Sequence, residues 1–363
     1  MSSHPRKLAL GATCAFAILI PAASAQALTK TVIVGTPASA QKTIGNTYSG
    51  DVDAFFPTSI TIDAGDKVKF VPSGFHTVEI PPKGSSDSAL VQPFTGKVAG
   101  ANDAAGAPFW FNGQDNLYFS LPLVQKQNFG KSLKYNGKNR IQSGLPLAAK
   151  PKPMVVTFTK KGKYTYFCNV HPGMKATVTV QKKGATRPPA AFDKRVVKQQ
   201  VNAATKVAKD LQSARPEDGT IQLGAAGKGG VEILAFFPAQ TTVPVGTTIK
   251  FAMPKGSRED HTATTGPGNP ETEPTSYLGT LAGSLQGPPP LNPAAIYPSD
   301  APGGAAASLT STTHGNGFWS TGFLDQSTAT PISDSSSVKF DQAGTYTFYC
   351  LIHPFMKATV VVS

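Results

Sequence analysis

Two short stretches of this sequence each place a thiol, an imidazole and a thioether at the same spacing. They share the pattern C-x-x-H-x-x-M and comprise Cys168, His171 and Met174 in the first stretch, and Cys350, His353 and Met356 in the second. Thiolate and thioether sulfurs are soft ligands that suit copper, especially Cu(I), while imidazole binds copper in either oxidation state. Two histidines and one cysteine with a weak axial methionine form a blue-copper electron-transfer centre. Each stretch therefore supplies three of the four ligands of such a centre.

The remaining histidine of each set has one good candidate upstream. His76 lies in Gly-Phe-His-Thr-Val, and His261 lies in Glu-Asp-His-Thr-Ala. The charged run 257–260 before His261 differs from the apolar setting of His76. His314, in Thr-Thr-His-Gly-Asn-Gly, is expected to be a surface-loop residue; the alternative is that it displaces His261 or caps the second site. We thus expect two copper ions per chain, with His76 and His261 completing the two sets.

Three other kinds of chemistry compete with a blue-copper centre for these residues. A disulfide between Cys168 and Cys350 is the ordinary use of a cysteine pair in an exported protein, but it would leave the spaced histidines and methionines without a purpose. Zinc is disfavoured, because a thioether is a poor zinc ligand and zinc has no redox function. An oxidase with a trinuclear copper centre is excluded by the supply of histidines: of six, one is His4 in the leader and only His314 is unassigned. We expect no enzymatic activity.

The first residues have the layout of an export signal. A basic start at Arg6 and Lys7 precedes an apolar stretch over 8–20 and the small residues of 23–25. The apolar stretch is too short for a membrane span, which favours a cleaved secretory peptide over 1–27, with cleavage after Ala25 or Ala27. The mature chain is then expected to be soluble in the periplasm or outside the cell, with no transmembrane segment.

The rest of the chain is a tandem duplication. The motif Ala-Phe-Phe-Pro occurs at 54–57 and again at 235–238, an offset of 181 residues, and the two C-x-x-H-x-x-M stretches are offset by 182. We expect units over 28–182 and 220–363. Within each, short alternating runs such as 60–70 and 241–251 indicate strands, and Tyr164, Tyr166 and Cys168 fall on one inward face. Many short strands with Gly and Pro turns predict a β-sandwich.

Each unit resembles a cupredoxin of the plastocyanin and amicyanin kind. The resemblance rests on G-x-Y-x-[YF]-[FY]-C-x-x-H-P-x-M after an upstream His-Thr, and it is strongest over 164–180 and 346–362. It implies an all-β chain of two tandem Greek-key sandwiches, one-electron transfer by one type 1 copper in each unit, and Met174 and Met356 as axial ligands. Copper sequestration or delivery in the envelope is the alternative function with the same ligands. A copper-free recognition module on the same scaffold is a third possibility.

The segments outside these motifs carry three further expectations. A shared G-x-x-F-W-x-x-G surrounds Trp110 and Trp319, which we expect to be packing residues rather than electron relays. The Pro-, Gly- and Ser-rich run 266–311 is expected to be disordered. An apolar stripe predicts a spacer helix over 192–213 that lies against one or both units; its members are Val197, Val201, Ala204, Ala208 and Leu211.

The linker over 183–219 is also the most basic part of the chain. The stretch 182–215 contains nine Lys and Arg against two Asp, out of a formal net charge of +13 for the whole sequence. A solvated basic linker is expected; the alternative is a docking patch for an acidic partner or an anionic envelope surface. The expected partner is an extracytoplasmic redox protein, possibly an acidic one. Nucleic acid is not expected as a partner, and the oligomeric state is open.

Overall fold

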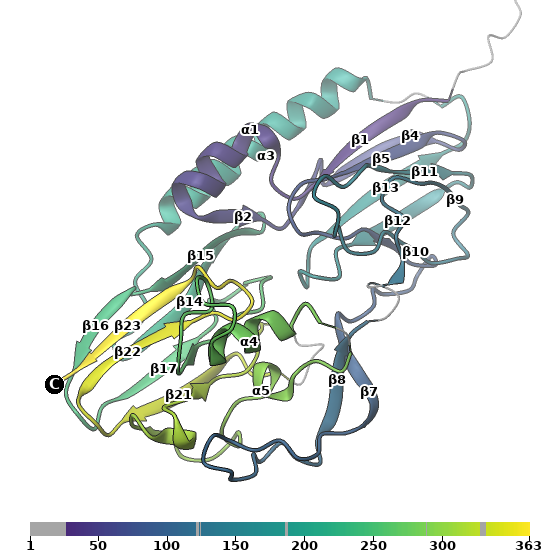
Figure 1. Cartoon of the computed structure of the whole chain (residues 1–363). Coiled ribbons are helices and arrows are strands. Elements are labelled where there is room, and N and C mark those ends of the chain that lie inside the picture. The colour runs from purple at the N-terminus through teal and green to yellow at the C-terminus, as the bar shows by residue number, and fades with distance from the viewer. Residues whose placement is uncertain (1–26, 121–122, 124, 186–187, 288, 327–331) are drawn as a thin grey trace, which may run out of the picture.

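The computed structural model describes residues 27–120, 123, 125–185, 188–287, 289–326 and 332–363 (Figure 1). Of the predicted signal peptide over 1–27, residues 1–26 lie outside the described part of the chain. Within the described ranges, no helix is both long and apolar enough to cross a bilayer.

The first unit is a sandwich of two five-stranded sheets, as its alternating sequences predict. Side chains from both sheets interleave in its core, among them Val32, Phe70 and Tyr166. One sheet has the order β3 (Phe55–Phe56), β1 (Thr29–Val34), β5 (Lys67–Pro72), β11 (Met154–Phe158), β9 (Ser132–Tyr135). The other has the order β10 (Ile141–Gln142), β6 (Glu79–Ile80), β12 (Gly162–Phe167), β13 (Lys175–Gln181), β4 (Ser59–Asp63).

The second unit repeats this two-sheet arrangement around its own core, which includes Phe251, Trp319 and Phe348. One sheet has the order β19 (Ala307–Leu309), β21 (Ser335–Phe340), β17 (Thr248–Ala252), β14 (Thr220–Gly227), β15 (Val231–Phe237), β2 (Gly50–Val52). The other has the order β16 (Gln240–Val243), β23 (Lys357–Val362), β22 (Gly344–Tyr349), β18 (Thr264–Thr265), β20 (Trp319–Ser320). The prediction of an all-β chain of cupredoxin-like sandwiches is confirmed.

The strand that leads into each C-x-x-H-x-x-M stretch alternates as predicted. Tyr164, Tyr166 and Cys168 are all buried, and in the second unit Phe348 and Cys350 are buried in the same way. Since side chains on a strand repeat every second residue, this register brings each thiol into the apolar interior. β12 and β22 therefore deliver the two cysteines to equivalent places.

The two units are not separate along the chain. β2 belongs to the first unit in sequence, yet it pairs antiparallel with β15 at the edge of the second unit's sheet, with Val52 opposite Val231. The hairpin of β7 (Val91–Lys97) and β8 (Asp115–Phe119) also leaves the first sandwich and lies beside the second unit (Figure 1). A division of the chain at 183–219 does not describe these contacts.

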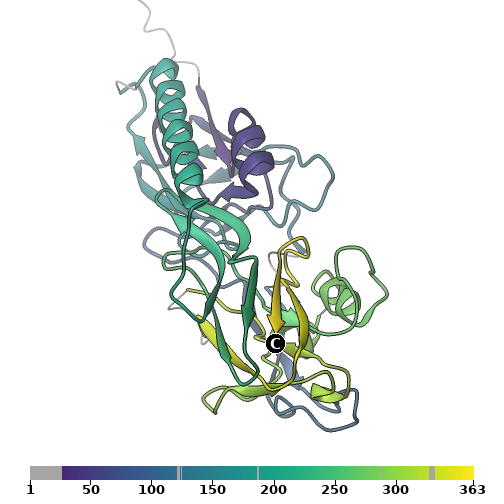
Figure 2. The ribbon, with the colours of Figure 1, turned by 90° about the vertical axis from the view of Figure 1, so that its left-hand side faces the viewer.

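The linker contains the predicted helix, α3 (Ala190–Leu211), which begins and ends two residues before the expected positions. The predicted apolar stripe packs into a cluster that includes Ile44 and Phe56 of the first unit and Ile233 of the second. Figures 1 and 2 show α3 along one side of the molecule, beside α1 (Ala38–Gln41) and the π-helix η1 (Lys42–Thr47). The helix therefore joins the units through apolar contacts with both.

The expectation of disorder over 266–311 is wrong. Apart from residue 288, this run is described, and it contains α4 (Tyr277–Ser284), α5 (Pro293–Ile296) and β19. A 3₁₀ turn, η2 (Thr313–Gly315), follows. The apolar residues of the run 266–311 share one core with residues of the first unit's insert. In this core, Leu278, Leu281, Leu291 and Ile296 pack with Phe109 and Phe111. Burial of these side chains favours an ordered chain despite its composition.

Candidate metal centres

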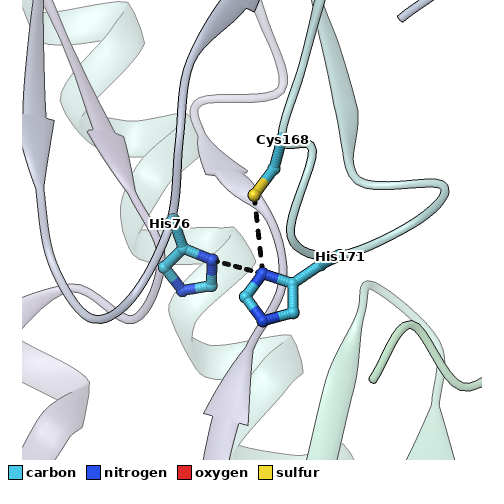
Figure 3. A group of neighbouring side chains, drawn as sticks. All are labelled: His76, Cys168 and His171. Atoms are coloured by element: carbon cyan, nitrogen blue, oxygen red, sulfur yellow. Dashed lines mark hydrogen bonds between the residues drawn. The ribbon is translucent and has the colours of Figure 1, made fainter. Parts of the chain in front are cut away.

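His76, Cys168 and His171 meet inside the first unit (Figure 3). The Nδ1 atoms of His76 and His171 lie 2.9 Å apart, and the Sγ of Cys168 lies 3.5 Å from the Nδ1 of His171. His76 comes from the loop between β5 and β6, and the other two residues come from the turn between β12 and β13. All three side chains are buried.

His261, Cys350 and His353 form the same arrangement in the second unit. The Sγ of Cys350 lies 3.7 Å from the Nδ1 of His261 and 3.8 Å from the Nδ1 of His353, and the two Nδ1 atoms lie 3.2 Å apart. His261 and Cys350 are buried, while His353 keeps 18% of its side chain exposed. In each unit, the structure brings together the two histidines and the cysteine that the sequence predicted.

The spacing of these atoms suits one ion bound by all three. Histidine–metal bonds of about 2.0 Å and cysteine–metal bonds of about 2.3 Å at angles of about 120° would place the two nitrogens about 3.5 Å apart and each nitrogen about 3.7 Å from the sulfur. The sulfur–nitrogen distances of the second set match this separation, that of the first set is slightly shorter, and the two nitrogens lie closer together than this in both sets, at 2.9 Å and 3.2 Å. Two Nδ1 atoms and a thiolate are ligands that copper accepts in both oxidation states.

The methionines close both turns in the same way. The N–H of Cys168 donates to the carbonyl of Met174 over 3.0 Å, and the N–H of Met174 donates to the carbonyl of His171 over 3.0 Å. In the second unit, the N–H of Cys350 donates to the carbonyl of Met356 over 3.1 Å. Both methionine side chains are buried, and each packs in the same apolar cluster as its cysteine.

The threonine that follows each upstream histidine holds the cysteine turn. The N–H of Thr77 donates to the Sγ of Cys168 over 3.3 Å, and the N–H of Thr262 donates to the Sγ of Cys350 over 3.4 Å. The Thr77 hydroxyl also accepts from the N–H of Asn169 over 2.8 Å. Hydrogen bonds to a ligating sulfur tune the reduction potential of a metal site. The hydrogen bonds of the threonine to the cysteine turn therefore explain why threonine follows the upstream histidine in both motifs.

The surroundings of both cysteines lower the pKa of the thiol. Burial raises the pKa of the Cys168 thiol, but the charge of His171 and hydrogen bonds from both histidines outweigh burial and hold that pKa well below its ordinary value. The pKa of the Cys350 thiol is lowered in the same way, by hydrogen bonds from His261 and His353 and by their charge. Burial lowers the pKa of His353, yet hydrogen bonding and the charge of Cys350 raise it to about 8. A bound metal cation would supply the same kind of positive charge beside each buried sulfur.

Carboxylates that sequence reasoning missed line the first centre. An Oδ2 of Asp51 lies 3.6 Å from the Nε2 of His76, and an Oδ1 of Asp53 lies 3.9 Å from the Nδ1 of His171. Asp51 lies within the short strand β2, and Asp53 directly follows it. Burial is the main cause that raises the pKa of Asp53 to about 8. Glu259 is a third carboxylate near this centre, 3.3 Å from the Nε2 of His171. The spacing of the motifs does not indicate Glu259, although it lies in the charged run 257–260 that distinguishes His261 from His76.

His314 lies elsewhere. Its Nδ1 is 3.3 Å from Asp103 and its Nε2 is 3.5 Å from Asp300. Its side chain is 17% exposed, so it is more enclosed than a surface-loop residue. The histidine that the structure groups with Cys350 and His353 is His261.

The two tryptophans are packing residues, as expected. Trp319 is 1% exposed and contacts Phe251 and Phe348 in the second core. Trp110 is half-buried, and its indole N–H donates to the carbonyl of Pro298 over 2.8 Å. Trp110 therefore fastens the first unit's insert to the second unit.

Comparison with known proteins identifies part of the first unit. Residues 125–181 match the family of copper-binding proteins described as plastocyanin/azurin. Solved structures that match include a reduced mutant of amicyanin, at 18% identity over 41% of this chain and 86% of that one, with a TM-score of 0.21. Another is the oxidised plastocyanin of Dryopteris crassirhizoma, at 23% identity over 40% of this chain and 99% of that one, with a TM-score of 0.20. No curated protein matches the sequence.

The matched segment contains Cys168, His171 and Met174, and it ends with β13. Over this stretch the chain is similar to the plastocyanin/azurin family, which agrees with the cupredoxin resemblance of the sequence motifs. The match itself does not reach the second unit.

Proposed function

We propose that this chain is an exported electron carrier with one type 1 copper in each unit. The proposed ligands are His76, Cys168, His171 and Met174 in the first unit, and His261, Cys350, His353 and Met356 in the second. The observation that carries the proposal is the repeated convergence of two Nδ1 atoms and one thiolate sulfur in buried, equivalent places. Copper bound there would supply one-electron oxidation and reduction.

The role of the protein is to hold the ligands in fixed positions and to exclude water from them. A site that changes oxidation state with little rearrangement needs ligands that stay in place, and a β-sandwich core supplies rigid support. Each cysteine lies on the interior face of its strand, and its sulfur accepts an N–H from Thr77 or Thr262. Burial of the sulfur excludes water, which together with that hydrogen bond would set the reduction potential.

We also propose the units over 28–182 and 220–363, joined by the linker 183–219, with export directed by residues 1–27. The separate cores of the two sandwiches support this division. The redox partner would be a protein outside the cytoplasm, since the proposed export signal precedes both units.

Metal analysis combined with an optical redox titration tests the function. We expect two coppers per chain, an intense visible charge-transfer band in the oxidised protein, and reversible bleaching on reduction. Fast copper exchange without a reversible couple would instead indicate copper delivery or sequestration. A protein isolated without copper, and unable to bind it, would contradict the proposal.

A further inference from the structure

Glu259 lies between the two candidate centres. Its Oε1 is 3.3 Å from the Nε2 of His171 in the first unit, and its Oε2 is 3.8 Å from the Nε2 of His353 in the second. The side chain is only 7% exposed. One buried carboxylate therefore faces a histidine of each centre, on the ring edge opposite to the Nδ1 atom that faces the sulfur.

The segment that carries Glu259 is fastened to both units. The N–H of Arg258 donates to Glu232 over 2.8 Å, and the N–H of Glu259 donates to the Ser257 hydroxyl over 3.2 Å. The Arg258 guanidinium donates to the backbone carbonyl of Asp53 in the first unit. The charged run that precedes His261, and has no counterpart before His76, thus forms one of the contacts between the units.

The chemistry of imidazole gives this contact a consequence. When Nδ1 binds a metal, Nε2 keeps its proton and acts as a donor, and metal-bound histidines commonly donate that proton to a carboxylate. The carboxylate fixes the tautomer and orientation of the ring and makes it a better ligand. In this chain, one carboxylate is placed to do so for two centres.

We infer that Glu259 is a positioning residue shared by the two copper centres, which makes them one electron-exchanging pair. The inference rests on the proposed function. Glu259 holds His171 and His353 in the tautomer whose Nδ1 faces the copper, and the two rings and the carboxylate form a continuous contact between the centres. In the exchange, the copper of one half loses the electron that the copper of the other half gains.

Exposure indicates which half meets an external partner. The side chain of His171 is 6% exposed and is covered by Glu259, whereas that of His353 is 18% exposed. Phe355, whose ring centroid lies 6.0 Å from that of His353, is 49% exposed. Electrons would enter or leave at the His353 edge, and the first centre would exchange them through the second.

The test compares Glu259→Gln with Asp260→Asn in the full-length protein. The glutamine keeps the size of the side chain but can present only one acceptor oxygen, and its amide nitrogen would face one of the two donors. The asparagine makes the same carboxylate-to-amide change at the neighbouring residue, whose buried Oδ1 has no hydrogen-bond partner in the described part of the chain. The pair therefore separates loss of the acceptor between the two histidines from the general effect of replacing a buried carboxylate with an amide.

Three readouts apply. Competition with a copper chelator should show about 10–100-fold weaker copper binding at both centres of Glu259→Gln, with a smaller change in Asp260→Asn. Proton–nitrogen NMR of the diamagnetic Cu(I) wild type should show slowly exchanging Nε2–H signals from His171 and His353, and both should shift in Glu259→Gln. After pulse reduction of the oxidised protein, exchange between the centres should be several-fold slower in Glu259→Gln.

The inference is overturned if Glu259→Gln alters neither histidine signal, or weakens copper binding no more than Asp260→Asn does. The wild-type NMR measurement decides the tautomer even if the variant folds poorly. These failures are distinct from failure of the proposed function, in which the wild type itself would lack two coppers or a reversible couple.

Discussion

Gly35 packs directly against the ring of His76. A Cβ added to Gly35 would lie 2.2 Å from Cδ2 and 2.4 Å from Nε2 of that ring, which is closer than real side chains approach. Gly35 also has a φ of 96°, in the left-handed region that favours glycine. The loop after β1 can therefore enclose His76 only when it has no side chain at this position.

We expect Gly35→Ala to displace His76 and to abolish copper binding in the first unit while the second unit keeps its copper. Metal analysis should find the copper content halved. Gly65→Ala is the matched control: its φ is 98°, but no atom lies within 4 Å of its added Cβ. That variant should cost only the backbone strain of about 1–2 kcal/mol in the free energy of unfolding and should retain both coppers. Full copper content in Gly35→Ala would show that His76 does not need this position.

His314 should make the stability of the protein depend on pH. Its hydrogen bond to Asp300, together with Asp103, raises the pKa of His314 above its ordinary value, although burial opposes the shift. A raised pKa means that the folded protein favours the protonated imidazole, so the stabilisation is complete below the unfolded-state pKa of about 6.5 and is lost as the pH rises through the folded-state value.

We therefore expect the wild type to exceed His314→Asn in free energy of unfolding by about 1 kcal/mol at acidic pH, and this difference to shrink as the pH rises above the ordinary histidine pKa of about 6.5 and through the folded-state pKa. Asparagine is chosen because it tolerates the positive φ of 50° at this position. Urea denaturation of the metal-free proteins at several pH values measures the difference. A constant difference across the range would mean that the protonated ring does not contribute.

Phe111 tests whether the first unit's insert stabilises the second. It is fully buried, and it stacks on Tyr297 of the second unit with ring centroids 5.7 Å apart. We expect Phe111→Ala to lower the free energy of unfolding by about 3–5 kcal/mol. Phe94→Ala, on the half-buried face of the hairpin, should have a much smaller effect. Circular dichroism during denaturation reports both values, and equal losses would contradict a shared core.

The sequence predicted the parts of the structure that depend on local pattern. The strand register that buries Cys168 follows from alternation, and α3 follows from a stripe that recurs every three to four residues. The upstream histidines could be chosen because His76 and His261 occupy equivalent places in a duplication. Each of these inferences needs only the pattern of residues along the chain and no knowledge of contacts between the units.

Contacts between the units could not be predicted in this way. The run 266–311 is ordered because Leu278 and Ile296 pack against Phe109 of the first unit, and no periodicity within the run reveals such a partner. Strand β2 is too short to indicate that it pairs with β15. Glu259 resembled an ordinary surface charge in the sequence, and only the fold shows that it is buried between two histidines.

The most direct test of the central claim is to replace the two cysteines one at a time with serine. Cys168→Ser and Cys350→Ser should each bind one copper per chain and keep about half of the charge-transfer absorbance, because the thiolate provides both the bond and the colour. The double variant should be colourless. A double variant that kept the visible band would contradict the assignment of both cysteines as copper ligands.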